Sequence, residues 1–146
     1  MEPDFQISKP IYPLKIASQL TETSVYSIRQ YIDKGLIIPL RTKTDRHLFS
    51  QVDIVRLNCI RRHLTTSGLN IAGIKAILAL IPCWSIKKCS EESRINCDAY
   101  YSTSYPCWEA SKKGKDCKNK NCRECNIYQL PAECPDMKSL IRKLIL

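Results

Sequence analysis

The sequence lacks a long apolar run, an N-terminal leader and the residue sets of common active sites. Its longest apolar stretch, around residues 77–82, is far too short to cross a bilayer. Its first residues show no basic-then-apolar pattern of a secretory signal. It has two histidines, no glycine-rich phosphate loop, and no acid–base or histidine–cysteine pair suited to catalysis. These absences predict a soluble intracellular protein that is not an enzyme.

Apolar residues make up 44% and charged residues 25% of the 146 residues, which predicts a folded chain of one medium or two small domains. The net charge is +9, divided as +5 in residues 1–81 and +4 in 82–146. Thiolates among the cysteines of the second half would make it negative, and two divalent ions would restore neutrality. The persistent basic character therefore belongs to the first half and favours a polyanionic partner.

Two short helices are expected between residues 12 and 34. Pro13 suits the first helical position, Thr23 or Ser24 can cap the second helix, and Gly35 is a natural terminator. Two helices joined by a tight turn form a helix-turn-helix, whose second helix would enter the major groove of DNA. Each polar residue on that helix also has a simpler interpretation as solvated surface. The candidate DNA contacts there are Ser24, Tyr26, Ser27, Arg29, Gln30 and Lys34.

A small hairpin should follow, because residues 37–40 and 46–49 bracket a polar stretch at 42–45. Such a wing would carry four further candidate DNA contacts near its tip, namely Arg41, Lys43, Arg46 and His47. Beyond it, Ser50 and Asp53 resemble a capping box that starts a third helix, on which Cys59 is expected as a small buried hydrophobe. Asn70 caps a fourth helix over residues 71–80.

This succession resembles the DNA-binding domain of the mercury-resistance regulator (MerR) family over about residues 11–81. The resemblance implies a homodimeric bacterial transcription regulator that contacts a promoter palindrome on double-stranded DNA and acts indirectly on RNA polymerase. Gln30 and the pair Arg46-His47 depart from the family pattern, and the family's long dimerisation helix does not follow Leu80. The resemblance rests on Leu14-Lys15-Ile16-Ala17, residues 28–37, Pro39, Arg41-Thr42, Leu48-Phe49-Ser50, Asp53-Ile54 and Gly68-Leu69.

The second half contains a repeated cysteine module. Pro82-Cys83-Trp84 recurs as Pro106-Cys107-Trp108, and a cysteine followed three residues later by tyrosine closes both units. The units span residues 82–100 and 106–128, and agreement at six positions indicates duplication. The pattern resembles the paired Cys-Trp (two-CW) modules attached to bacterial signalling proteins. The tryptophans and tyrosines are expected to form a small core around the cysteines.

Eight of the nine cysteines lie in this half, which is the number needed for two four-thiolate sites. Structural zinc would let a loop-rich stretch fold, whereas an iron–sulfur cluster would suit a redox sensor, and the spacing does not decide between them. Disulfides would be unusual beside a DNA-binding domain in a reducing compartment. The expected metal ligands are Cys83, Cys89, Cys97, Cys107, Cys117, Cys122, Cys125 and Cys134.

The expected fold is mainly α, with an N-terminal tail at 1–11, a winged helix-turn-helix of four helices and a hairpin at 12–81, a loop-rich metal-binding domain at 82–134, and a C-terminal amphipathic helix at 135–146. We expect that helix or the cysteine domain to supply the dimer contact. The predicted function is a cytoplasmic, metal- or redox-responsive DNA-binding regulator. The alternatives are an excisionase-like architectural module with purely structural zinc and a thiol or iron–sulfur redox protein.

Overall fold

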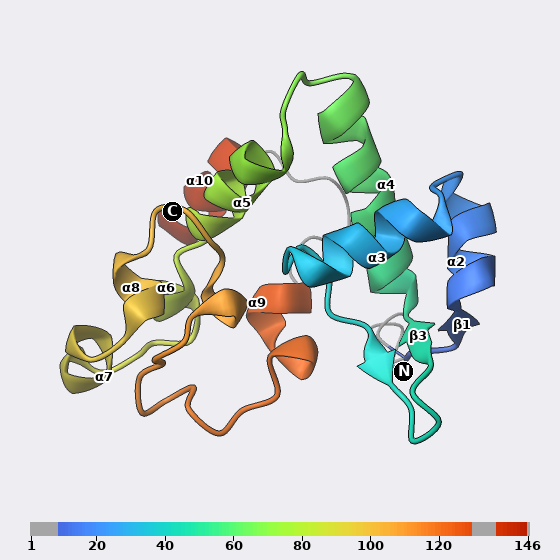
Figure 1. The fold of residues 1–146 in the computed structure, drawn as a ribbon. Coiled ribbons are helices and arrows are strands. Elements are labelled where there is room, and N and C mark those ends of the chain that lie inside the picture. Colours follow the sequence, from blue (N-terminus) through green and yellow to red (C-terminus); the bar gives the residue numbers. More distant parts are fainter. Residues whose placement is uncertain (1–8, 130–136, 146) are drawn as a thin grey trace. The chain divides into compact units, whose positions relative to one another are not determined.

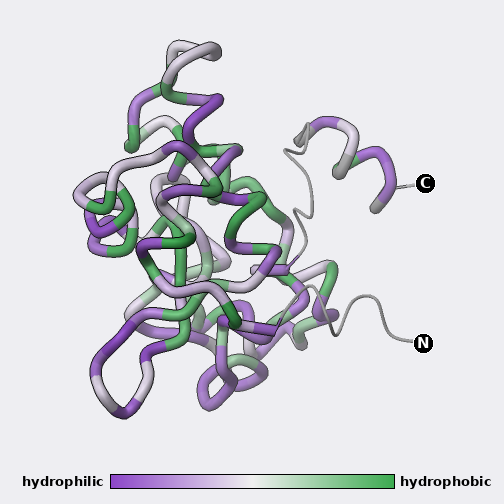
Figure 2. The backbone as a smooth tube through the Cα atoms, turned by 90° about the vertical axis from the view of Figure 1, so that its right-hand side faces the viewer, coloured by the Kyte–Doolittle hydropathy of each residue, from purple (hydrophilic) through white to green (hydrophobic). Residues whose placement is uncertain are grey.

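The structure, a computed structural model, describes residues 9–129 and 137–145. These residues divide into two compact units, one built on residues 9–68 and the other on 69–128 together with 137–145 (Figure 1). Hydrophilic and hydrophobic residues are interleaved along the chain (Figure 2). Within the described ranges, no helix combines the length and the apolar character that a membrane span requires.

The first unit has the helical order that the sequence predicts. After the short strand β1 (Tyr12–Pro13), helices α2 (Leu14–Thr21) and α3 (Val25–Asp33) form the helix-turn-helix. Strands β2 (Leu40–Arg41) and β3 (His47–Phe49) form the wing, and the long helix α4 (Gln51–Thr65) follows directly.

The N-terminal strand was not expected, and it corrects the prediction of a hairpin alone. Strand β1 pairs antiparallel with β3, with Tyr12 opposite Phe49 and Pro13 opposite Leu48, which makes a three-stranded sheet of order β1-β3-β2. Pro13 is extended, with φ −65° and ψ 162°, so it precedes helix α2 instead of opening it. Proline is tolerated there because β1 is an edge strand, where a missing N–H costs little.

The predicted helix starts are confirmed by their hydrogen bonds. The Ser24 hydroxyl accepts from the Ser27 N–H at 3.0 Å at the start of α3. Ser50 and Asp53 form a reciprocal capping box, with N–H to side-chain oxygen distances of 3.1 and 2.9 Å. Asn70 caps α5 (Ile71–Ala79) by accepting from the backbone N–H three residues later, at 2.8 Å. These bonds satisfy donors that the first turn of a helix leaves free.

The core of the first unit draws on both helices of the helix-turn-helix, the wing and α4. Burying these side chains supplies most of the free energy of folding for a unit of this size. Cys59 is buried on α4 as expected, 8% exposed, but its sulfur is in a disulfide, so it is not only the small buried hydrophobe that the sequence predicted. The completely buried apolar residues of this core are Ala17, Ile28, Leu36, Phe49 and Leu57.

The second unit consists of short helical turns where loops were expected. Helix α5, which continues the predicted helix-turn-helix domain in sequence, groups with this unit. Helix α10 (Met137–Ile145) falls within the predicted range of the C-terminal helix, residues 135–146. Most of its apolar side chains are outside the described residues. The other elements are α6 (Cys83–Ile86), α7 (Glu91–Ile95), α8 (Asp98–Tyr101), η1 (Cys107–Glu109), η2 (Cys122–Glu124) and α9 (Asn126–Gln129).

Candidate functional site

Helix α3 exposes a continuous polar face. Ile28 and Tyr31 turn into the core, so the residues between them on the helix surface face solvent. Tyr26 is 75% exposed, although it is a large aromatic side chain. An exposed aromatic flanked by cations and an amide is the surface that DNA recognition needs, with cations for phosphates and planar groups for base edges. The other predicted contacts exposed on α3 and its end are Arg29, Gln30 and Lys34.

The two predicted serine contacts are engaged within the helix. The Ser24 hydroxyl accepts the capping N–H and also donates to the Ser27 hydroxyl at 2.9 Å. Burial raises the pKa of Tyr31, and a hydrogen bond with Ser27 partly offsets that effect. Both serines therefore have a local structural role that any contact with DNA would have to accommodate.

The wing presents its cations beside one carboxylate. Arg41 Nε lies 3.0 Å from Asp45 Oδ1, and Lys43 and Arg46 are exposed. The turn closes through the Thr42 N–H, which donates to the Arg46 carbonyl at 2.8 Å. The tip thus keeps an exposed cationic surface although one of its arginines is paired.

His47 is the first residue of strand β3, directly beside the turn of the wing and close to where the sequence pattern had placed it. It is half-buried, with its ring edge-on to Phe49 at a centroid distance of 6.5 Å. Arg41, the last residue of β2, pairs with it in the sheet, so these two predicted contacts flank the turn that contains Lys43 and Arg46.

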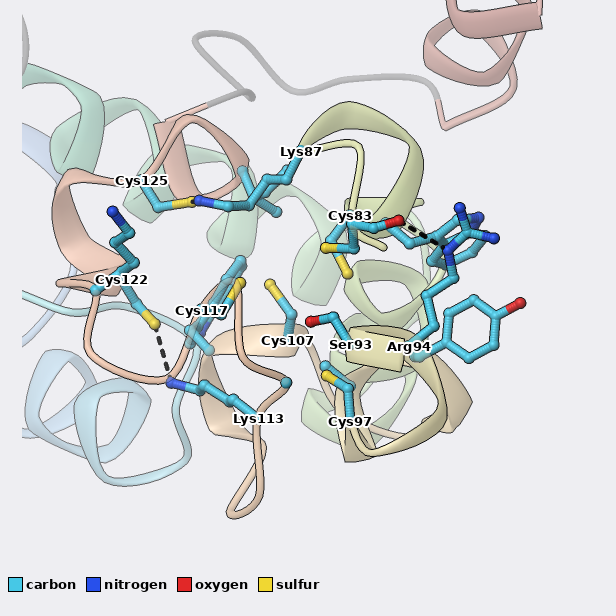
Figure 3. A pocket seen from close by; sticks show the side chains of 18 of the residues that line it. Cys83, Lys87, Ser93, Arg94, Cys97, Cys107, Lys113, Cys117, Cys122 and Cys125 are labelled. Atoms are coloured by element: carbon cyan, nitrogen blue, oxygen red, sulfur yellow. Dashed lines mark hydrogen bonds between the residues drawn. The ribbon is translucent and has the colours of Figure 1, made fainter. Parts of the chain in front are cut away.

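In the second unit, the side chains of the cysteine repeats surround one cavity (Figure 3). The labelled sulfurs come from both repeats and line the same space. The eighth predicted ligand, Cys134, lies outside the described residues. The cysteines that line the cavity are Cys83, Cys89, Cys97, Cys107, Cys117, Cys122 and Cys125.

An aromatic pair in each repeat frames this cavity. Trp84 packs edge-on against Tyr100 with a centroid distance of 5.2 Å and an interplanar angle of 84°. Trp108 packs against Tyr128 at 5.1 Å with the same angle. Two pairs of almost equal geometry at equivalent positions agree with the predicted duplication and with the predicted aromatic core around the cysteines.

Several cysteine sulfurs in the cavity accept hydrogen bonds from neighbouring side chains. Lys113 Nζ donates to Cys122 Sγ at 3.0 Å, and Lys87 Nζ to Cys125 Sγ at 3.5 Å. Cys83 accepts a hydrogen bond from Cys107, which lowers the pKa of Cys83 to about 7 and raises the pKa of Cys107. The Cys107 thiol donor thus favours negative charge on the sulfur of Cys83.

At two other cysteines, Cys89 and Cys117, burial favours the neutral thiol. It raises the pKa of Cys89, and it raises the pKa of Cys117 to about 11. Burial alone would lower the pKa of Lys87, but the neighbouring Cys125 and Cys117 raise it overall. The sequence pattern did not single out Lys87 or Lys113, because the two lysines do not occupy equivalent positions in the repeats.

The donor set fits a thiolate-bound metal centre. Thiolates are the preferred ligands of zinc and of iron–sulfur clusters, and seven cysteine side chains line one cavity. Among residues 9–129 and 137–145, however, no three histidine, cysteine or acidic side chains are already close enough to hold one ion. The sulfurs are spread along the wall of the cavity instead of meeting at a point.

Comparison with known proteins agrees with the geometry of the helix-turn-helix. Residues 12–81 match the family model described as "MerR HTH family regulatory protein". The chain is 42% identical over 73 residues to the HTH-type transcriptional regulator GlnR of Bacillus anthracis and equally to that of Bacillus cereus, covering 50% of this chain and 56% of the relative. It is 35% identical over 71 residues to the putative heat shock protein HspR of Streptomyces coelicolor, covering 49% and 47%.

The chain thus spans about half the length of the curated relatives it matches. The matched segment contains α2, α3, the wing, α4 and α5. The matched family consists of regulatory proteins and not of enzymes, in agreement with the sequence-based prediction. Residues 12–81 are therefore a helix-turn-helix domain of the MerR family.

Proposed function

We propose that this chain is a homodimeric transcription regulator that binds a palindromic promoter site on double-stranded DNA and acts on RNA polymerase through that DNA. The observation that carries the proposal is the family match of residues 12–81 combined with the exposed polar face of α3. The relatives named as HTH-type transcriptional regulators support the same function, and the bacterial cytoplasm is the corresponding location.

We assign the exposed residues to two kinds of DNA contact, with phosphates and with base edges. Arg29 and Lys34 on α3, with Lys43 on the wing, supply cations for phosphates. Tyr26 and Gln30 supply planar groups, and a glutamine amide can bond the adenine edge in the major groove. Affinity would then come mainly from the cations, and sequence preference from the centre of α3.

The second part of the proposal is that the cysteine-rich unit binds a metal centre whose state alters DNA binding. A bound zinc ion would cross-link the short helices, and an iron–sulfur cluster would add sensitivity to oxidants. An ion pair inside the second unit joins the cysteine repeats to α5, the last helix of the segment that matches the family model. Lys75 Nζ on α5, inside the matched segment, lies 2.9 Å from Glu109 Oε1 on η1, two residues after Cys107, and both side chains are only 22% exposed.

DNA binding is tested by selecting bound sequences from random double-stranded DNA with the full chain. We expect an inverted repeat, because a two-fold symmetric dimer reads two equivalent half-sites. Arg29→Ala should weaken binding to the selected site by about 1–3 kcal/mol. Lys118→Ala, which removes an exposed cation from the other unit, is the matched control and should change affinity much less. Equal losses for the two variants, or no enriched sequence, would contradict the proposal.

Metal responsiveness is tested on protein purified without oxygen. Elemental analysis, sulfide assay and the visible spectrum identify the centre, and DNA affinity is then compared between loaded, chelated and oxidised samples. We expect affinity to depend on the state of the centre and Lys75→Met to reduce that dependence. If affinity stays constant while the cysteine-rich unit merely unfolds, the metal is structural and the chain is an architectural DNA-binding module.

A further inference from the structure

The two cysteine repeats interlock and do not form separate lobes. The Asp98 N–H in the first repeat donates to the Lys112 carbonyl in the second at 2.8 Å. The Ser90 N–H donates to Asp116 Oδ2 at 3.1 Å. A Cβ at Gly114 would clash with the backbone oxygen of Ser93. The backbones of the two repeats are therefore so close at this point that no side chain larger than that of glycine fits. The repeats are therefore parts of one packed body.

The sulfur chemistry also crosses between repeats. Cys83 and Cys107, the equivalent first cysteines of the two units, line the same cavity, and each shifts the pKa of the other. Lys87 belongs to the first repeat but donates to Cys125, the closing cysteine of the second. In Figure 3 these groups face the same cavity.

Ligand number gives an independent argument. The first repeat, residues 82–100, contains only three cysteines and no histidine. A structural zinc site needs four ligands, and an all-cysteine cluster site also needs four. A site for the first repeat must therefore take at least one thiolate from outside that repeat, and Cys107 lines the same cavity as Cys83.

We propose that the two repeats share one polynuclear metal–thiolate centre, with Cys83 and Cys107 at its middle, and do not hold one ion each. This inference rests on the metal binding in the proposed function. A thiolate can bridge two divalent ions, and an iron–sulfur cluster likewise spans ligands that do not meet at one point. A cluster suits sulfurs that are spread along a cavity wall where no three are close enough for a single ion among the described residues. In a bridged pair each ion needs its own four ligands, so the sulfurs would have to move together on binding.

The inference replaces two separate four-thiolate sites, which the count of eight cysteines suggested, with one shared site. Lys87 and Lys113 fit this arrangement because a centre with several thiolates carries excess negative charge. N–H donors to ligand sulfur stabilise such charge and tune the metal.

The test uses cobalt(II) as a paramagnetic probe, added without oxygen to the reduced, metal-free full chain. Binding is followed by thiolate-to-cobalt absorption and by electron paramagnetic resonance at each equivalent. If thiolates bridge the ions, magnetic coupling makes the resonance intensity per cobalt fall as the second ion binds. If the sites are separate, intensity rises in proportion to bound cobalt up to full loading, and the inference is overturned while metal binding stands.

Single variants give a second readout. Cys83→Ser and Cys107→Ser, one from each repeat, should each alter the spectrum of the whole centre, and the double variant should add little. Additive loss of one ion per variant, with the remaining ion unchanged, would also overturn the inference. Iron and sulfide in the protein as purified would assign the shared centre to an iron–sulfur cluster, and zinc alone to bridged zinc. Absence of any metal binding would remove the metal part of the proposed function as well.

Discussion

Different interactions stabilise each of the two units of this chain. The helix-turn-helix unit has a core of completely buried apolar residues and a helix of 15 residues that begins with a capping box. The cysteine-rich unit has helices of three to five residues between Cys83 and Gln129, and such helices are not stable alone in water. Its order depends on two aromatic pairs, contacts between repeats and the sulfurs. The comparison teaches that a unit of this size with a sparse core needs an additional cross-link.

The largest expected effect comes from removing metal. Because both tryptophans, Trp84 and Trp108, lie in the cysteine repeats, their fluorescence reports on that unit alone. Adding a chelator should change tryptophan fluorescence strongly and open the amides of residues 83–128 to hydrogen exchange. Exchange in α4 should stay nearly unchanged. If chelation left both units unaffected, or opened α4 equally, the contrast between them would be wrong.

The reverse experiment weakens the first unit. Leu57→Ala deletes a completely buried side chain from α4 and should destabilise the helix-turn-helix by about 2–5 kcal/mol. Leu20→Ala is the control, because Leu20 is 51% exposed and its loss should cost little. Chemical denaturation followed by far-ultraviolet circular dichroism measures both. A similar loss for the two variants would argue against a core centred on α4.

Two glycine substitutions in the second unit test whether the cysteine repeats pack closely against each other. Gly114→Ala places a methyl group against the Ser93 backbone and should cost about 1–3 kcal/mol through overpacking between the repeats. Gly73→Ala adds a methyl group in helix α5 at ordinary contact distances of 3.4 Å or more, and should stabilise that helix by up to about 1 kcal/mol. Thermal unfolding followed by tryptophan fluorescence compares them. Opposite signs are expected, and equal shifts would be evidence against close packing at Gly114.

The smallest effect is expected on the wing. Asp45→Asn removes the ion pair with Arg41 but keeps a residue that tolerates the left-handed backbone at φ 62°. Both side chains of the pair are more than two-thirds exposed, so stability should change by less than about 1 kcal/mol. DNA affinity should rise, because a negative charge leaves the wing. Titration of labelled DNA at two salt concentrations measures this, and unchanged or weaker binding would exclude the wing as a phosphate contact.

Much of the first unit could be predicted from sequence because its signals are local. Ser24, Ser50 and Asn70 occupy helix starts where their side chains can reach an N–H three residues ahead, and each makes that bond. Strand β1 could not be predicted in this way. It has two residues, one of them proline, and it is a strand only because β3 offers a free edge.

In the second unit, the sequence predicts the cysteine repeats better than the cavity that they line. The repeat spacing identified the cysteines and their aromatic partners, and the paired rings agree with it. The choice of bases for the DNA contacts stays a prediction, as does the dimer contact. Lys87, Lys113 and Gly114 carried no periodic signal, because each acts on the opposite repeat or on a sulfur distant in sequence.

By itself, the sequence determined the elements whose cause lies within a few residues: the helix starts, the turn glycine Gly35 with φ 77° and the duplicated cysteine module. Only the tertiary structure decided which sulfurs face one another, that α5 groups with the cysteine-rich unit, and that one cavity serves both repeats. The physical reason is the sequence separation between the interacting residues. Caps and turns are satisfied by neighbouring backbone groups, whereas a thiolate cavity is built from contacts between residues that are tens of positions apart.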